Sequence, residues 1–237
     1  MTKLIFDIET VGEDWEDYDE ITKKVLTRWL KKEAFSEDEY EKALEDIKNG
    51  LGFSPLTGEI VAIGVLELET NKGAVYYQSP DKKIEDFEEE DIKFRALSEK
   101  DMLEKFWHGI IEYPEFISFN GRAFDVPFLM FRSAVHKVKP TKDLMSNRYL
   151  NSQKFNAQHI DLLDQLTFYG AVRRKPSLHL VCRALGIKSP KGEGVTGDEI
   201  KNLFKEKEYL KIARYNSWDL RATKEVYERW NNYINIK

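Results

Sequence analysis

Residues 3–10 read Lys-Leu-Ile-Phe-Asp-Ile-Glu-Thr, a short apolar run that ends in acids. The run predicts a buried strand. Asp7 and Glu9 are two residues apart, so both side chains lie on one face of such a strand. Two neighbouring carboxylates repel each other unless a proton or a cation separates them, and such oxygen ligands suit Mg²⁺ or Mn²⁺. The stretch therefore predicts either a strand that delivers two acids to a metal site or a solvated strand end.

The segment after this strand has a different character. Residues 12–50 are acidic, aromatic and helical in period, and they predict a helical insertion between two strands that extends over about 12–56. Ser36 followed by Glu39 has the spacing of a capping box and predicts a helix start within it. Residues 60–69 and 74–78 are joined by a turn with asparagine and glycine, which predicts a hairpin.

The rest of the chain mixes strands with helices. Further strands are predicted at 116–119 and 160–166 (the latter with a helix start as the alternative), an acidic loop at 81–92, a glycine-containing loop at 190–197, and helices at 98–112, 126–136, 177–185 and 210–233. This order predicts an α/β domain with a mixed five-stranded sheet flanked by helices.

Composition limits the class of protein. The 237 residues, 41% of them apolar, fit a single domain spanning 1–237. A net charge of −5 argues against a protein that coats nucleic acid by electrostatics alone. A membrane span and a secretory signal are not expected, and Cys182 alone makes neither a disulfide nor a zinc knuckle. A cytoplasmic protein is therefore expected.

A third acid follows the strand predicted at 116–119. Residues 118–125 read Ser-Phe-Asn-Gly-Arg-Ala-Phe-Asp and precede an apolar helix. The structural alternative for Asp125 is a helix N-cap. The functional interpretation places Asp125 at the carboxyl ends of the strands, where open α/β sheets hold their sites.

A fourth acid lies in the last predicted helix. Tyr215 and Asp219 are four residues apart and share a helix face. Ala222, Val226, Trp230 and Tyr233 continue that stripe, so Asp219 is in line with a core-facing surface. A carboxylate there needs a partner, which could be a metal ion or a basic side chain.

Together these stretches resemble the three motifs of the DEDD superfamily of 3′→5′ exonucleases, which have an RNase H-like fold. The matching stretches are the aspartate-any-glutamate of 7–9, the asparagine and phenylalanine-aspartate of 120–125, and the tyrosine-any-three-aspartate of 215–219. Arg214 stands where the histidine type would need histidine, so the third motif is of the tyrosine (DEDDy) type.

Within that superfamily, residues 119–122 and 159–162 are similar to the proofreading exonuclease domain of family B DNA polymerases and its stand-alone relatives. The resemblance covers most of 1–10 and 58–233 but not the helical insertion. The sequence ends soon after the third motif, so no polymerase module is expected.

The resemblance implies two divalent metal ions, Mg²⁺ or Mn²⁺, about 3.5–4 Å apart. Asp7 would bridge both ions, and Glu9 and Asp219 would complete the site for the attacking water. Asp125 would hold the second ion, largely through water. Tyr215 would orient the nucleophile by hydrogen bonding.

Several other residues are candidates for contact with nucleic acid. Thr10 could contact the terminal sugar through its backbone, and Asn120 the terminal nucleotide. Phe124 could stack on a base or be a core aromatic. Lys191 is a candidate phosphate contact, with a solvated loop lysine as the alternative. Asp161 is either an acid supporting the metal ligands or a helix cap.

The expected function is removal of nucleoside 5′-monophosphates from the 3′ end of single-stranded DNA or frayed ends, in DNA repair or proofreading. One alternative is an exoribonuclease of the same superfamily, because that choice depends on how the site treats one 2′-hydroxyl. Another is a catalytically idle, nucleic-acid-binding subunit. The acidic insertion could also dock a protein partner.

Overall fold

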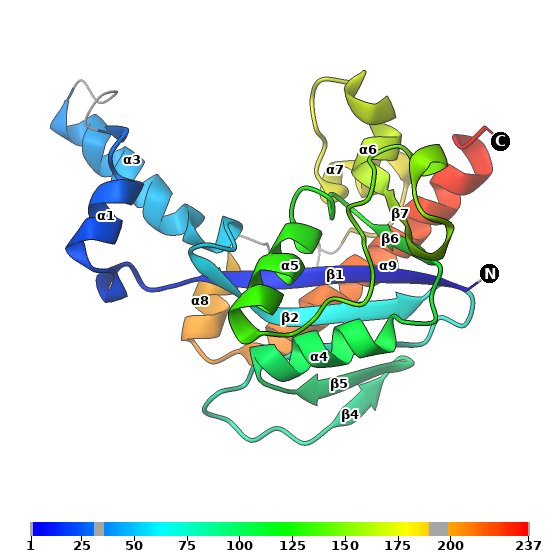
Figure 1. Ribbon diagram of the computed structural model, residues 1–237, viewed down its shortest axis with the longest axis horizontal. Helices are drawn as coiled ribbons and strands as arrows, with labels where there is room; N and C mark the ends of the chain where they lie inside the picture. Colours follow the sequence, from blue (N-terminus) through cyan, green and yellow to red (C-terminus); the bar gives the residue numbers. More distant parts are fainter. Residues whose placement is uncertain (1, 31–35, 190–198, 237) are drawn as a thin grey trace.

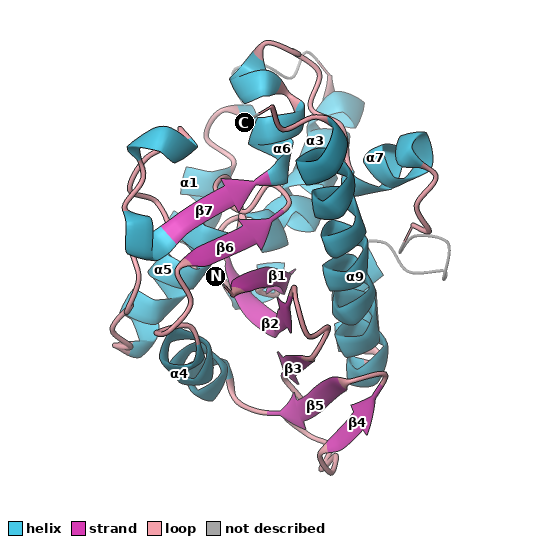
Figure 2. Cartoon of the chain, turned by 90° about the vertical axis from the view of Figure 1, so that its right-hand side faces the viewer, coloured by secondary structure: helices cyan, strands magenta, loops and turns pink. Residues whose placement is uncertain are grey.

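The computed structural model describes residues 2–30, 36–189 and 199–236, and within them seven strands form one sheet in the order β4-β5-β3-β2-β1-β6-β7. The strands are β1 (Lys3–Gly12), β2 (Gly58–Glu67), β3 (Gly73–Tyr77), β4 (Phe87–Glu89), β5 (Ile92–Ala96), β6 (Glu115–Ser118) and β7 (Gln158–Asp161). The helices are α1 (Glu20–Leu26), α3 (Glu37–Gly50), α4 (Glu99–Gly109), α5 (Asp125–His136), α6 (Leu162–Leu166), α7 (Leu178–Leu185), α8 (Ile200–Lys205) and α9 (Tyr209–Tyr233). Helices cover both faces of the sheet (Figure 1, Figure 2).

Strand β1 lies inside the sheet and pairs on both edges. It runs antiparallel to β2 along most of its length but parallel to β6 only over residues 3–5. Phe6 belongs to the core cluster formed with α4 and α5, whereas Ile5 belongs to the cluster on the α9 side. Because strand side chains alternate, Asp7 and Glu9 share the α9 face with Ile5.

The edge of the sheet differs from the expectation. The predicted number of five strands is wrong, because β4 and β5 add a hairpin where an acidic loop was expected at 81–92. The turn residues Glu90 and Asp91 have φ of 50° and 64°, a conformation that usually selects glycine or asparagine. Phe87 stacks on Phe94 across the hairpin, with ring centroids 4.7 Å apart. The missing turn signal and the acidic composition together conceal these strands.

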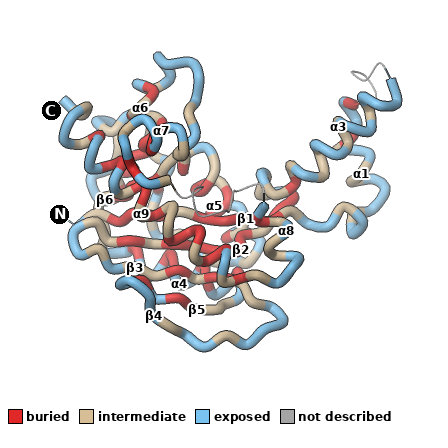
Figure 3. Tube along the Cα trace, turned by 180° about the vertical axis from the view of Figure 1, so that it is seen from behind, coloured by how far each residue is buried: buried red, intermediate tan, exposed pale blue. Residues whose placement is uncertain are grey.

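The helices α1 and α3 project from one end of the sheet (Figure 1, Figure 3). We call residues 13–30 and 36–57 the arm; it includes the 3-10 turn η2 (Leu51–Phe53) at its base. The predicted helix start is confirmed, because the Ser36 hydroxyl accepts a hydrogen bond from the Glu39 N–H at 3.2 Å. Neither α1 nor α3 has a buried residue, so most of the arm lies outside the core.

Residues 160–166 realise both predicted alternatives. Strand β7 ends at Asp161, and α6 begins at the next residue, where the Asp161 carboxylate caps the Leu163 N–H at 2.9 Å. The helix predicted at 177–185 is confirmed with a Ser177 cap and Gly186 at its end. The loop predicted at 190–197 lies outside the described residues.

The last helix, α9, is one continuous element of 25 residues. It packs across β1, β2 and β3, and its buried side chains extend from Tyr209 to Trp230 (Figure 2). The predicted core-facing stripe is wrong at Tyr233, which lies at the end of the helix and is 78% exposed. Across the described ranges, no helix combines the length and apolarity that crossing a bilayer requires.

Candidate active site

Strand β1 and helix α9 bring three acids together. Asp7 and Glu9 point to the α9 face, and Asp219 reaches them from the middle of α9. Ligand oxygens of the three carboxylates all lie within 4.8 Å of one another. Two of the three come from a strand pattern and one from a helix about 210 residues later, so only the packed fold assembles the group.

The protonation behaviour of this cluster reflects crowding of like charges. Burial raises the pKa of Asp7 well above its usual value, and the charges of Asp125, Asp219 and Glu9 raise it further. Burial, Asp219 and Asp125 likewise raise the pKa of Glu9. The leading influence that lowers either pKa is a hydrogen bond from Asn216, and not a basic side chain. A cation between the carboxylates would relieve this repulsion.

The donor set fits a hard divalent cation. Carboxylate oxygens are ligands that Mg²⁺ and Mn²⁺ accept, and three of them converge here from rigid elements. Asp7 and Asp219 are partly exposed, whereas Glu9 is buried. The cluster therefore combines a buried anchor with two acids that solvent and a substrate can reach.

Asn216 is a site residue to which the sequence reasoning assigned no role. Its side-chain amide donates to Asp7 Oδ2 at 2.8 Å, while its Oδ1 is buried without a hydrogen-bond partner. It lies against Gly64 of β2, where an added Cβ would be only 1.9 Å from Oδ1. A signal was present, because Asn216 directly follows Tyr215 and is three residues before Asp219 on the same helix.

We expect Gly64→Ala to disturb the site through Asn216, which packs between Gly64 and Asp7. The methyl group would displace Asn216 and with it the hydrogen bond to Asp7, lowering the free energy of unfolding by about 1–3 kcal/mol and weakening Mn²⁺ binding. Urea unfolding and calorimetric titration with Mn²⁺ measure the two effects. Gly109→Ala is the control, since nothing lies within 4 Å of a Cβ added there. Equal Mn²⁺ affinity of Gly64→Ala and wild type would contradict the role given to Asn216.

Asp125 lies beside the three acids but outside their group. Its Oδ1 accepts from the Ile8 N–H at 3.1 Å, in the part of β1 beyond its pairing with β6. Burial raises the pKa of Asp125 to about 7, with hydrogen bonds from its own N–H and Ile8 opposing the shift. Phe124, rather than Asp125, occupies the N-cap of α5, so the N-cap alternative is wrong. Binding of a second ion by Asp125 stays a prediction.

The loop that delivers Asp125 is fixed by Asp161. The Asp161 carboxylate accepts from the N–H groups of Asn120 and Arg122, both at 2.9 Å. Asn120 has a φ of 65°, and a Cβ at Gly121 would be 2.1 Å from Ser118 Oγ. Asp161 caps α6, as the helix-cap alternative predicts, and also shapes this loop, whereas its support of metal ligands stays a prediction.

Tyr215 lies within hydrogen-bonding contact of the acids. Burial raises the pKa of Tyr215 well above its usual value, and the charges of Asp219, Glu9 and Asp7 raise it further, as does a hydrogen bond to Asp219. The phenol therefore stays protonated at neutral pH and acts as a hydrogen-bond donor rather than as a base.

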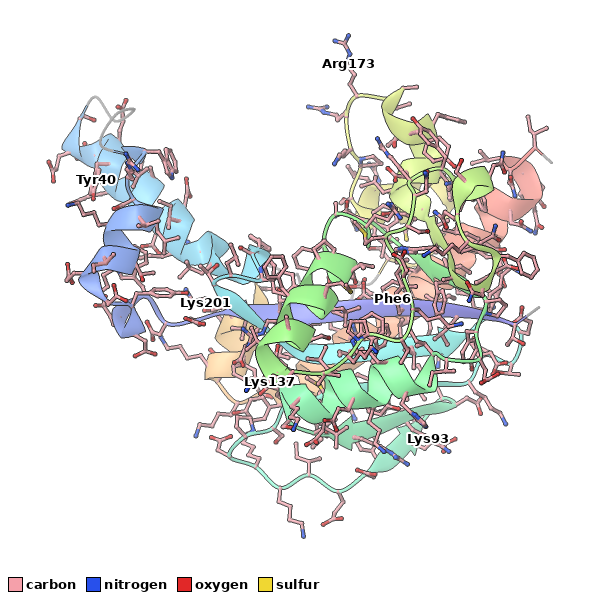
Figure 4. The ribbon with its side chains drawn as sticks, in the orientation of Figure 1. Phe6, Tyr40, Lys93, Lys137, Arg173 and Lys201 are labelled. Atoms are coloured by element: carbon pink, nitrogen blue, oxygen red, sulfur yellow. The ribbon has the colours of Figure 1, made fainter. Side chains whose placement is uncertain are left out.

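The candidate nucleic-acid contacts divide between two hollows. Thr10 and Phe124 line a cleft of about 650 Å³ together with Glu9. Asn120 lines a separate groove of about 320 Å³. The basic residues of that groove are Arg122, Arg148, Arg173 and Lys175. Figure 4 shows Arg173 projecting outward from the loop before α7. Lys191 lies outside the described residues.

Comparison with known proteins shows the family of the chain. Residues 56–235 match a family model described as a predicted 3′-5′ exonuclease related to the exonuclease domain of PolB, and the chain belongs to this family. DNA polymerase 1 of Sulfurisphaera ohwakuensis is 22% identical over 96% of the chain, and DNA polymerase 1 of Saccharolobus solfataricus is 24% identical over 98%. The chain spans 27% of each polymerase.

A solved structure supports the fold. The family B DNA polymerase from the hyperthermophilic archaeon Pyrobaculum calidifontis matches 97% of the chain with a TM-score of 0.55 and 17% sequence identity. The match covers 24% of that polymerase chain. The predicted RNase H-like fold is confirmed, with seven strands in place of five.

Proposed function

We propose that the chain removes nucleoside 5′-monophosphates one at a time from the 3′ end of single-stranded DNA or of a frayed duplex. The observation that carries this proposal is the convergence of Asp7, Glu9 and Asp219 at the part of β1 beyond its pairing with β6, with Asp125 and Tyr215 beside them. The polymerase relatives favour DNA as the substrate and DNA repair or proofreading as the setting.

In this proposal, the carboxylates of Asp7, Glu9, Asp125 and Asp219 hold two divalent cations, Mg²⁺ or Mn²⁺. When bound, such cations lower the pKa of an attacking water and stabilise the leaving oxygen. The Asn216 amide fixes the orientation of Asp7. The Ile8 N–H does the same for Asp125, so neither carboxylate has to be reordered when a substrate arrives.

The direct test uses single strands labelled at the 5′ end and incubated with Mg²⁺ or Mn²⁺. The proposal expects a ladder that shortens by single nucleotides and stops when the metal is chelated. Matched DNA and RNA strands separate a deoxyribonuclease from an exoribonuclease. An endonucleolytic band alone, or binding without cleavage in either metal, would contradict the proposal.

Tyr215→Phe is expected to slow hydrolysis by on the order of 100-fold without loss of metal binding. The variant lacks the protonated hydroxyl that would orient the nucleophile, but it retains every carboxylate. Single-turnover rates measure the first effect and calorimetry with Mn²⁺ the second. Tyr233→Phe is the matched control on the same helix, because Tyr233 is 78% exposed. A Tyr215→Phe enzyme with the wild-type rate would exclude this role.

A further inference from the structure

The base of the arm is locked onto β1 beside the acids. A Cβ at Gly12 would lie 2.6 Å from the Leu51 Cβ, and a Cβ at Gly52 would lie 3.0 Å from the Gly12 N. These contacts mean that the backbone of η2 lies directly against the end of the strand. The Thr10 hydroxyl donates to the Gly52 carbonyl at 2.7 Å, and the Thr57 hydroxyl donates to the Leu51 carbonyl at 2.7 Å. The turn η2 is therefore held in a fixed place relative to Glu9.

Phe53 is the exposed residue of this anchored turn. Leu51 in the same turn is 3% exposed, whereas the Phe53 ring is 59% exposed. A large aromatic ring on a fixed backbone, open to solvent, is available for contact at little entropic cost. Phe53 lines the 650 Å³ cleft that also contains Glu9 and Phe124.

The walls of the cleft come from three separate parts of the chain. The strand end and Phe124 form one side, the arm supplies Asp46 and Asn49, and α8 supplies Lys201 and Asn202. Lys201 Nζ donates to the Lys48 carbonyl at 3.2 Å and so ties α8 to the arm. Figure 4 labels Lys201 where α8 meets the base of the arm.

The chemistry of these walls suits a nucleoside better than a phosphate. Away from the carboxylate cluster, the Asp46 carboxylate lines the cleft and would repel a phosphate, and Lys201 is the one lysine among the lining residues. Two aromatic rings and two side-chain amides offer stacking and hydrogen bonds to a flat, polar group. The volume of about 650 Å³ lies in the range of ligand-sized sites.

We propose that the arm forms the wall of the subsite for the 3′-terminal nucleotide, and that Phe53 stacks on its base. This inference rests on the proposed function, because it places the terminal phosphate at the carboxylate cluster and the terminal base in the adjoining cleft. The insertion then acts as a substrate clamp in addition to any role as a protein-docking surface.

The test measures whether Phe53 contributes to binding of the 3′-terminal base. Two single strands with a 5′ fluorophore are compared by anisotropy, one with a normal 3′-terminal nucleotide and one with an abasic residue there. The terminal linkage is a phosphorothioate and Ca²⁺ is the sole divalent cation, so that the strands stay intact. Wild type should bind the normal end about 5-fold or more tightly than the abasic end.

Phe53→Ala should lose this preference, and Phe53→Trp should keep it. An abasic residue at an internal position should change the binding affinity of Phe53→Ala by the same factor as that of wild type. Phe155→Ala is the control, because Phe155 is 69% exposed and precedes β7 at the end opposite to Asp161. Thermal unfolding of each variant checks that the fold is intact.

The outcomes separate the two proposals. If Phe53→Ala keeps the wild-type preference, or wild type shows none, the stacking role is overturned. If wild type discriminates between the ends but degrades neither DNA nor RNA in Mg²⁺ or Mn²⁺, the proposed hydrolysis fails while the subsite stands.

Discussion

Replacing Asp7 with asparagine is expected to reduce hydrolysis by about 10³-fold or more and to leave the metal-free protein at least as stable as wild type. The new amide keeps the shape of the side chain and an oxygen that can accept from Asn216. It removes the charge that Asp125, Asp219 and Glu9 repel. We expect a gain of on the order of 1 kcal/mol without divalent ions. We also expect Mn²⁺ to raise the melting temperature of wild type but not that of the variant.

Asp86→Asn is the matched control for this prediction. Asp86 and Glu88 have the same two-residue spacing as Asp7 and Glu9, but Asp86 is an exposed partner of Arg95. Its replacement should change the free energy of unfolding by less than about 0.5 kcal/mol and leave hydrolysis unchanged. If the stringently purified Asp7→Asn variant degraded the labelled strands at the wild-type rate, the assignment of the site would be refuted.

Glu99→Gln is expected to lower the free energy of unfolding by about 3–5 kcal/mol. Glu99 is 4% exposed and accepts from the Ile60 N–H at 2.8 Å, from Arg132 Nε and Nη2 at 2.8 and 2.7 Å, and from His136 Nε2 at 2.6 Å. Glutamine has one acceptor oxygen, and its amino group would face these donors, so the half-buried Arg132 would lose its counter-charge. Urea unfolding at pH 7 measures the loss.

The pH dependence of stability gives a second readout of Glu99. Burial opposes its ionisation, but hydrogen bonds from Arg132, Ile60 and His136 outweigh burial and hold the pKa of Glu99 below its usual value. The ionised Glu99 therefore contributes to the free energy of unfolding above its pKa in the unfolded chain, which is about 4.3. This contribution is lost as the pH falls through the lower pKa of Glu99 in the folded protein. Glu99→Gln should lose less stability than wild type over that acid range.

Glu104→Gln is the control for Glu99, since Glu104 lies on the same helix with a side chain 53% exposed beside Lys100. It should change stability by less than about 0.5 kcal/mol. A Glu99→Gln variant as stable as Glu104→Gln would show that the buried cluster contributes no net stability.

The sequence predicts the elements whose signals are local. The apolar run of residues 3–10 gives β1, the Ser36 cap begins α3, and period-two spacing puts Asp7 and Glu9 on one face. Strands β4 and β5 are missed because their turn adopts positive φ without glycine or asparagine. Local pattern therefore suffices for most of the sheet but not for its edge.

The residues of the site likewise divide into those that local patterns predict and those that depend on tertiary contacts. The acids can be predicted because each follows a recognisable strand or helix pattern. Its neighbours Tyr215 and Asp219 mark Asn216 as close to the site, but its role depends on α9 crossing β2 at Gly64, a tertiary contact that this spacing does not reveal. The position of Phe53 likewise depends on η2 folding back onto β1, which no spacing in the insertion reveals.

The continuity of α9 has a consequence for how mutational scans of this protein are interpreted. Tyr215, Asn216 and Asp219 belong to the same unbroken rod as Tyr227 and Trp230, which are 5% and 4% exposed. Truncating either distant aromatic would let the rod shift as a unit and misalign Tyr215 and Asp219, which lie roughly two to four turns away. A screen that measures activity alone would therefore identify Tyr227 and Trp230 as catalytic residues, although neither belongs to the site.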